Sequence, residues 1–175
     1  MDALAVVAVF SLCWFAIGVV TGYAGHRLPL TAIDHDTWLT RLRSFEDEGR
    51  AYDRLLRIRR WKDLLPEAGA AFRGGVSKSQ LPGRGRQDLE RFAAETRRAE
   101  YVHWANAAAG PLFWIFQPLW VAGIMTAFGM AVHLPFVAIQ RYNRARIMRT
   151  LARRQGPSGA GGLASPNAGG NQLPT

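Results

Sequence analysis

The sequence predicts an all-α integral membrane protein with an N-terminal transmembrane helix, amphipathic cytoplasmic helices and a second membrane segment or hairpin. Three observations indicate this class: an apolar N-terminal run, a long uncharged stretch in the second half, and a basic polar section between them. The mean hydropathy of -0.06 is near zero because it averages apolar and polar sections. The separate sections therefore decide the prediction.

The first apolar run extends from Ala3 to Tyr23 and carries no charge across 21 residues, which is long enough to span a bilayer. We expect residues 1–23 to form this helix. Met1-Asp2 lacks the positive charge that begins a signal peptide, which favours a retained anchor over a cleaved leader. Cys13 is the only cysteine, so neither an internal disulfide nor a cysteine zinc site is possible.

The second apolar stretch, Ala105–Ile139, contains 35 residues without Asp, Glu, Lys or Arg, and we assign 105–140 to a second membrane segment. A straight helix of this length would measure about 52 Å, whereas the hydrocarbon core is roughly 30 Å thick. Two full spans with a turn would need about 40 residues. We expect a hairpin broken near Pro111 or Pro118, which would bring the polar clusters at its two ends together.

Positive charge is concentrated in two parts of the chain. The net charge is +9, and every Lys and Arg lies in 27–98 or 141–154; the latter has six Arg and no acid. Beside a membrane segment, such arginines bind anionic lipid and mark the cytoplasmic face. We therefore expect a multi-pass protein of the bacterial cell membrane with a basic juxtamembrane helix over 141–155. Nucleic-acid binding is disfavoured, since no helix-turn-helix or aromatic RNA-binding motif is present.

The polar section, residues 24–104, is predicted to be mainly helical. From Asp36 to Leu65, apolar residues recur at roughly helical spacing among seven arginines. Such a helix commonly lies in the headgroup plane, although packing against neighbouring helices explains the pattern equally well. A second helix is expected from Asp88 to Trp104. Residues 156–175, rich in Gly, Pro, Asn and Ser, are expected to form a disordered tail.

A cluster that precedes the second membrane segment is the candidate catalytic site. Glu95, Thr96, Ala99, Glu100 and His103 fall within one helical face of roughly 140°. Glu100 and His103 are three residues apart, so the carboxylate can bond one imidazole nitrogen, fix its tautomer and raise the basicity of the other nitrogen. A surface ion pair without function would have the same spacing. Its position beside the membrane and among aromatic and Arg residues favours a general base.

Several other kinds of site are disfavoured. Glu-x-x-His is also the spacing of carboxylate-bridged di-metal bundles, but no second copy occurs, so we expect no metal. The chain has no phosphate-binding Gly-x-x-x-x-Gly-Lys, no His-Glu-x-x-His and no Gly-x-Ser-x-Gly.

A second polar cluster, Gln140–Arg146, directly follows the apolar stretch. On a continuing helix Gln140, Asn143 and Arg144 lie near one another, whereas Arg141, Arg144 and Arg146 cannot all share a face. Arg offers paired donors to phosphate or carboxylate. A simple positive-inside anchor would need only the charge.

Three segments together resemble the bacterial carotenoid-glycoside acyltransferases of staphyloxanthin-type pathways, formally glycosyl-4,4'-diaponeurosporenoate acyltransferase. They are RWKDLLPEAG at 60–69, ETRRAEYVHW at 95–104, and Leu134-Pro135 leading into QRYNR at 140–144. The resemblance covers roughly residues 1–150. His133 and Phe136 depart from the family pattern, which has Asn before and Cys after the Leu-Pro pair, and the tail is longer.

The resemblance implies an integral membrane enzyme that esterifies a sugar hydroxyl of a glycosylated C30 carotenoid acid, or a related glycolipid, with a fatty acyl group. We expect acyl-CoA as donor and no bound cofactor. On chemical grounds His103 is the base, Arg97 and Asn143 are oxyanion donors, and Trp61 and Trp104 stack on sugar or polyene. The expected site residues are His103, Glu100, Glu95 and Arg97 for catalysis, and Trp61, Lys62, Arg98, Trp104, Gln140, Arg141, Asn143, Arg144 and Arg146 for substrate binding.

Two alternatives to an enzyme remain open from the sequence. One is a non-catalytic membrane subunit or scaffold of a cell-envelope complex, which binds a partner protein. In that case Glu95, Arg97, Arg98 and Glu100 would form interhelical ion pairs. The other is a glycolipid carrier, which would hold lipid without converting it.

Overall fold

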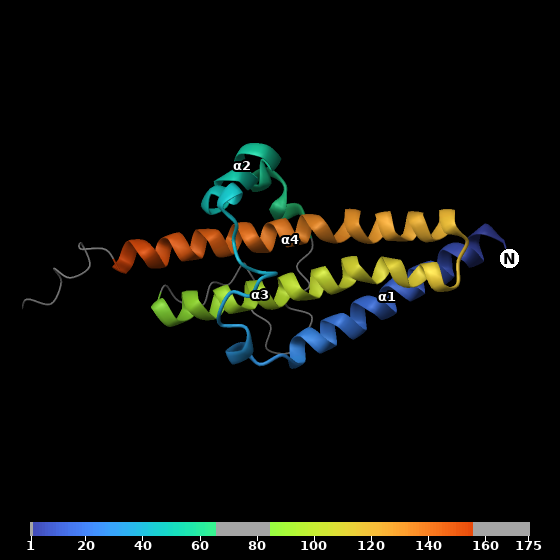
Figure 1. Ribbon diagram of the computed structural model, residues 1–175, viewed down its shortest axis with the longest axis horizontal. Coiled ribbons are helices and arrows are strands. Elements are labelled where there is room, and N and C mark those ends of the chain that lie inside the picture. Colours follow the sequence, from blue (N-terminus) through green and yellow to red (C-terminus); the bar gives the residue numbers. More distant parts are fainter. Residues whose placement is uncertain (1, 66–84, 156–175) are drawn as a thin grey trace, which may run out of the picture.

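Three long helices build the protein: α1 (Ala3–Arg27), α3 (Arg86–Ala109) and α4 (Leu119–Gln155). The computed structural model describes residues 2–65 and 85–155, and within these ranges all regular structure is helical, as predicted. In Figure 1, α1 and α4 run in one direction, and α3 lies beside both and runs in the opposite direction. The predicted tail and residues 66–69 of the RWKDLLPEAG segment fall outside the described residues.

Helix α1 has the length and composition of a membrane span. Asp2 caps its N-terminus by accepting a hydrogen bond from the Ala5 N–H at 2.7 Å. Leu4–Arg27 and Leu119–Gln155 are the two helices among the described residues long and apolar enough to cross a bilayer. None of the most apolar window of α1 is buried in the protein. Apolar side chains exposed on this scale are typical of a surface that faces lipid.

The second apolar stretch supplies the turn and the second helix of a hairpin, whereas most of the first helix is the polar segment 86–104. Helix α3 ends at Ala109, the 3-10 helix η6 (Gly110–Ile115) reverses the chain, and α4 begins at Leu119. A Cβ on Gly110 would lie 2.7 Å from the Thr126 Cα, so this close approach of turn and helix needs glycine. The chain therefore reverses between the two prolines, as the length argument predicted, and α4 continues without interruption into the basic region.

Helix α1 packs against α3 through small and polar residues. Asn106 donates a hydrogen bond from Nδ2 to the Thr21 Oγ1 at 2.8 Å, and Gly25 leaves room for Val102. Gly129 of α4 similarly makes room for the Trp14 ring of α1. Small residues and polar pairs of this kind hold apolar helices together where no water is expelled.

The predicted continuous helix from Asp36 to Leu65 is wrong. Asp47, Glu48 and Arg57 adopt positive φ, and Gly49 has φ of 87°, so the α-helical hydrogen-bond ladder cannot continue through these residues. The segment forms short elements instead, after η1 (Leu30–Ala32): η2 (Ser44–Gly49), α2 (Arg50–Leu56), η3 (Ile58–Arg60) and η4 (Lys62–Leu64). Its turns fold it back across α4, as Figure 1 shows.

Two apolar clusters pack the end of the hairpin that carries the charged residues, residues 86–104 of α3 and 139–155 of α4. Ile58, Ile139 and Tyr142 form one cluster, with Trp61 and Tyr52 packed against it. The second cluster joins α3 to the end of α4 through Leu89, Phe92, Ala93, Ile147 and Leu151. The folded-back segment and both long helices therefore meet where the charged clusters lie.

Candidate functional site

A buried network of four charged residues joins the folded-back segment to the hairpin. Glu100 of α3 lies 2.6 Å from Arg141 Nη1 through Oε1 and 2.6 Å from Arg144 Nη1 through Oε2. Glu46 of η2 receives Arg141 Nε at 2.7 Å and Nη2 at 2.9 Å. The Glu100 and Arg144 side chains are 0% exposed. Pairing of opposite charges is what permits charge at this depth, because a lone buried charge is strongly destabilising.

Arg141 uses all of its donors inside the protein. Besides the bonds to Glu46 and Glu100, its Nη1 donates to the Leu39 carbonyl at 3.0 Å and its Nη2 to the Arg41 carbonyl at 2.7 Å. A guanidinium has five N–H groups, and these five bonds account for them. A phosphate could bind Arg141 only by displacing one of these acceptors.

The carboxylate of Glu46 is likewise hydrogen-bonded within the protein. Burial by itself would raise the pKa of Glu46, but hydrogen bonds from Arg141, the Tyr52 hydroxyl and the Arg43 backbone N–H outweigh it and hold the pKa below its ordinary value. Burial and the hydrogen bond to Glu46 raise the pKa of Tyr52. Glu46 is therefore an ionised, fully bonded carboxylate, which is poorly suited to accept a proton at neutral pH.

Further contacts hold residues 28–40 against the hairpin. Arg144 donates to the Thr40 carbonyl, and Arg97 Nε donates to Asp36 Oδ1 at 2.6 Å. Arg98 pairs with Glu95 within α3 at 3.0 Å and donates to a backbone carbonyl in the segment after α1. Glu100 thus forms the interhelical pairs that the scaffold alternative predicted, whereas the Glu95–Arg98 pair is intrahelical.

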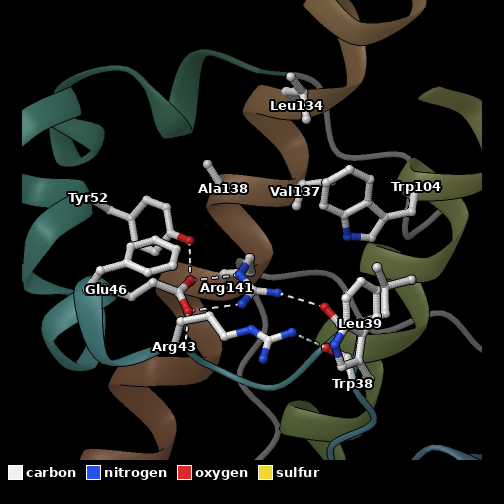
Figure 2. A pocket seen from close by; sticks show the side chains of 11 residues that line it. Trp38, Leu39, Arg43, Glu46, Tyr52, Trp104, Leu134, Val137, Ala138 and Arg141 are labelled. Atoms are coloured by element: carbon white, nitrogen blue, oxygen red, sulfur yellow. Dashed lines mark hydrogen bonds and ion pairs between the residues drawn. The ribbon is translucent and has the colours of Figure 1, made fainter. Parts of the chain in front are cut away.

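A pocket of about 390 Å³ opens beside this network. Figure 2 shows an apolar wall made by Trp104 of α3 with Leu134, Val137 and Ala138 of α4, and a facing wall where Arg141 meets the folded-back segment. The polar atoms of that second wall are already bonded to one another, so the pocket suits an apolar chain better than a charged group. Its lining residues are Trp38, Leu39, Arg43, Phe45, Glu46, Tyr52, Trp104, Leu134, Val137, Ala138 and Arg141.

His103 lies in a different place, between the helices in the apolar half. Its ring stacks on Phe136 with centroids 4.7 Å apart and an interplanar angle of 11°. Its Nδ1 lies 3.3 Å from His133 Nδ1. His103 does not line the pocket. Neighbouring residues project about 100° apart on a helix, so His103 points in a different direction from Trp104, which lines the pocket.

The remaining predicted residues are spread around α4. Trp61 donates from Nε1 to the Leu56 carbonyl at 2.8 Å, and Lys62 pairs with the neighbouring Asp63. Arg146 is exposed, with its guanidinium carbon 5.6 Å from the centre of the Tyr142 ring. Gln140 is buried and Asn143 half-buried. The structure therefore gathers Glu100, Trp104, Arg141 and Arg144, and leaves Trp61, Lys62 and Arg146 outside the pocket lining.

Sequence reasoning missed Glu46, Asp36, Thr40 and Trp38. A signal for the two acids was available: residues 141–154 carry six Arg and no acid, so any buried Arg there needs a carboxylate from elsewhere in the chain. Among the residues with described positions, no three His, Cys, Asp or Glu side chains gather as a metal ion would require.

Two apolar helices, α1 and α4, a polar helix α3 that forms a hairpin with α4, a buried charged network and a pocket with an apolar wall define the class: a small α-helical protein with membrane-type helices and a site for an apolar chain. The chain belongs to the glycosyl-4,4'-diaponeurosporenoate acyltransferase family, whose family model matches residues 35–153. This confirms the resemblance, and the matched range includes the network, the pocket and both histidines of the His103–His133 pair.

Curated relatives carry the same name. The glycosyl-4,4'-diaponeurosporenoate acyltransferase of Staphylococcus haemolyticus is 29% identical over 140 residues, which cover 79% of this chain and 81% of that protein. The namesake from a bovine strain of Staphylococcus aureus is 25% identical over 147 residues, covering 82% and 88%. No solved structure matches. The chain is therefore an acyltransferase of this family.

Proposed function

We propose that the protein esterifies a sugar hydroxyl of a glycosylated carotenoid, or of a related glycolipid, with a fatty acyl group taken from acyl-CoA. The observation that carries this proposal is the position of the pocket. Its apolar wall belongs to the apolar half of the hairpin, and its polar wall lies where the charged segments begin. A molecule with a long apolar chain and a polar head needs both environments next to each other.

The reaction requires two proton transfers, to the base and then to the leaving group, and one exchange of bonds at a carbonyl carbon. His103 takes the proton of the sugar hydroxyl, and the oxygen attacks the acyl carbonyl. The tetrahedral oxyanion collapses, the C–S bond breaks, and the leaving thiolate takes up the proton. Arg97 and Asn143 are the proposed oxyanion donors. Asn143 is half-buried, and Arg97 is held by Asp36.

The phosphates of the acyl donor need cationic partners. Of the three arginines predicted for this role, Arg141 and Arg144 are buried and bonded within the network, whereas Arg146 is exposed. We therefore assign the donor phosphates to Arg146, with Arg153 and Arg154 exposed about two turns further along α4, and a structural role to Arg141 and Arg144. Anionic lipid headgroups are the proposed partners of the same exposed arginines.

We further propose that α1 and the hairpin lie in the bacterial cell membrane with both basic regions in the cytoplasm. Single cysteines at Ser44 and Gln155, in a Cys13→Ala background, test this arrangement with a membrane-impermeant thiol reagent. Both sites should be protected in intact cells and labelled after lysis. Labelling of Ser44→Cys alone in intact cells would contradict the shared side.

The function itself is tested by mass spectrometry of lipids and pigments from cells with and without the gene. An acylated glycoside that appears only with the gene, at the mass of the acceptor plus one fatty acyl group, supports the proposal. Unchanged lipids together with a protein partner that copurifies stoichiometrically would favour the scaffold instead.

A further inference from the structure

We propose that His133 of α4 is the positioning residue for His103: it fixes the tautomer of that imidazole and stabilises the positive charge that His103 gains when it accepts a proton. The inference deepens the proposed function and rests on it, because it supplies the partner of the proposed base. Glu100 was expected in this role from its spacing along α3.

The geometry of the two rings carries the inference. Their Nδ1 atoms lie 3.3 Å apart, and the ring centroids are 5.5 Å apart at an interplanar angle of 36°. Two neutral imidazoles can bond in this way only when one nitrogen bears hydrogen and the other presents a lone pair. If His103 donates from Nδ1, its Nε2 keeps the lone pair that a general base needs.

Aromatic neighbours hold both rings in place. Phe136 stacks on His103 and lies three residues after His133, so one face of α4 presents both contacts to α3. Trp14 of α1 lies 6.3 Å from the His133 ring. Contacts from three helices thus limit the rotation of the pair.

Glu100 is engaged elsewhere. Its two oxygens meet Arg141 and Arg144 at 2.6 Å, and Oε1 also accepts a hydrogen bond from Trp104 Nε1 at 3.3 Å. A carboxylate shared between two guanidinium groups has little remaining capacity to polarise an imidazole. The compensated carboxylate lies three residues before His103 on α3, and His133 contacts His103 from α4.

The proton balance follows from the pair. When Nε2 of His103 takes the proton of the sugar hydroxyl, the ring becomes imidazolium, and its Nδ1–H bond to His133 becomes charge-assisted and stronger. The same proton then leaves from Nε2 to the thiolate. His133 contributes by stabilising the intermediate charge, and the pair ends each cycle as it began.

Two substitutions separate positioning from packing. His133→Phe keeps a ring but removes the acceptor, whereas His133→Asn puts an oxygen close to where Nδ1 was. We expect His133→Phe to lower kcat by about tenfold or more with KM nearly unchanged, and to shift the acid limb of the pH–rate profile. His133→Asn should recover most of the rate. His35→Phe, which alters an exposed histidine in the segment after α1, is the matched control.

Nitrogen NMR of histidine-labelled full-length protein in lipid nanodiscs gives a readout that does not need turnover. The wild type should show His103 protonated at Nδ1 and unprotonated at Nε2, and His133→Phe should lose this preference. The opposite tautomer, equal losses in the Phe and Asn variants, or full activity of His133→Phe would overturn the inference. If His103→Gln is itself fully active, the proposed base fails, and this inference fails with it.

Discussion

The two sides of the contact between α3 and α4 differ in how many of their polar groups are already bonded within the protein. On one side Glu46, Glu100, Arg141 and Arg144 satisfy one another almost completely. On the other side His103 and His133 meet through their Nδ1 atoms among aromatic rings. The first arrangement is suited to holding the fold and the second to moving a proton, although sequence spacing placed Glu100 and His103 in one unit.

Removing the central arginine should show the largest effect. Arg141→Met leaves Glu46 and Glu100 short of a partner in the interior, and breaking a buried pair in this way costs about 3–5 kcal/mol. We expect a large drop in thermal stability in detergent or a loss of folded protein. Arg146→Met, which changes an exposed arginine on the same helix, should stay within about 0.5 kcal/mol of the wild type. Equal melting of the two variants would contradict a structural network.

Replacing His103 should have the opposite effect, lowering turnover rather than stability. His103→Gln should fold and insert normally, yet its turnover should fall by a factor on the order of 10² or more. Glu100→Gln should cost less in turnover per folded molecule and more in stability, because Glu100 pairs with two arginines. Steady-state kinetics combined with thermal melts check both halves. Near-normal turnover in His103→Gln would exclude this residue as the base.

Sequence reasoning succeeded where local rules or a length argument were sufficient. The uncharged helix after Ala3, the helix over 88–104 and the reversal between Pro111 and Pro118 followed from hydropathy, from helix length against bilayer thickness, and from proline chemistry. The 35 uncharged residues are too many for one membrane span and too few for two, and this mismatch in length is what predicted a reversal of the chain.

The same reasoning failed where the determinants are tertiary. Asp47, Glu48 and Arg57 take positive φ without being glycine, and the apolar spacing around them is compatible with a helix. Glu46 and Arg141 are 95 positions apart, and His103 and His133 are 30 apart. These pairs could be found only once the register of the hairpin was known.

Two substitutions on α4, one inside the pocket and one outside it, test whether a substrate occupies the pocket. Ala138→Trp fills the cavity from its apolar wall, whereas Ala131→Trp adds the same ring at an exposed position one heptad earlier. We expect the first substitution to raise the KM of the substrate whose chain occupies the pocket by about tenfold, or 1.4 kcal/mol, and the second to leave it unchanged. Titrating acceptor and donor separately identifies that substrate. Equal KM values in both variants would show that the pocket is not used.

Acid should lower the stability of the folded protein by a modest amount through Glu46. Glu46 has a pKa below the ordinary value of 4.5 in the folded protein, so the folded state binds its proton less readily than the unfolded state. Its contribution to stability is present above about pH 4.5 and is lost as the pH falls through the folded-state pKa. Melting temperatures measured from pH 6 to pH 3 should fall less steeply for Glu46→Gln. Parallel curves would rule out this contribution.

Acyl transfer by the purified protein tests the central claim most directly. The full chain in lipid nanodiscs is supplied with a fatty acyl-CoA and a glycosylated carotenoid, and the acceptor is weighed by mass spectrometry before and after. The account predicts a product heavier by one fatty acyl group, formed by the wild type and largely missing with His103→Gln. An acceptor of unchanged mass with the wild type, across a series of acyl-CoA chain lengths, would contradict the proposed reaction.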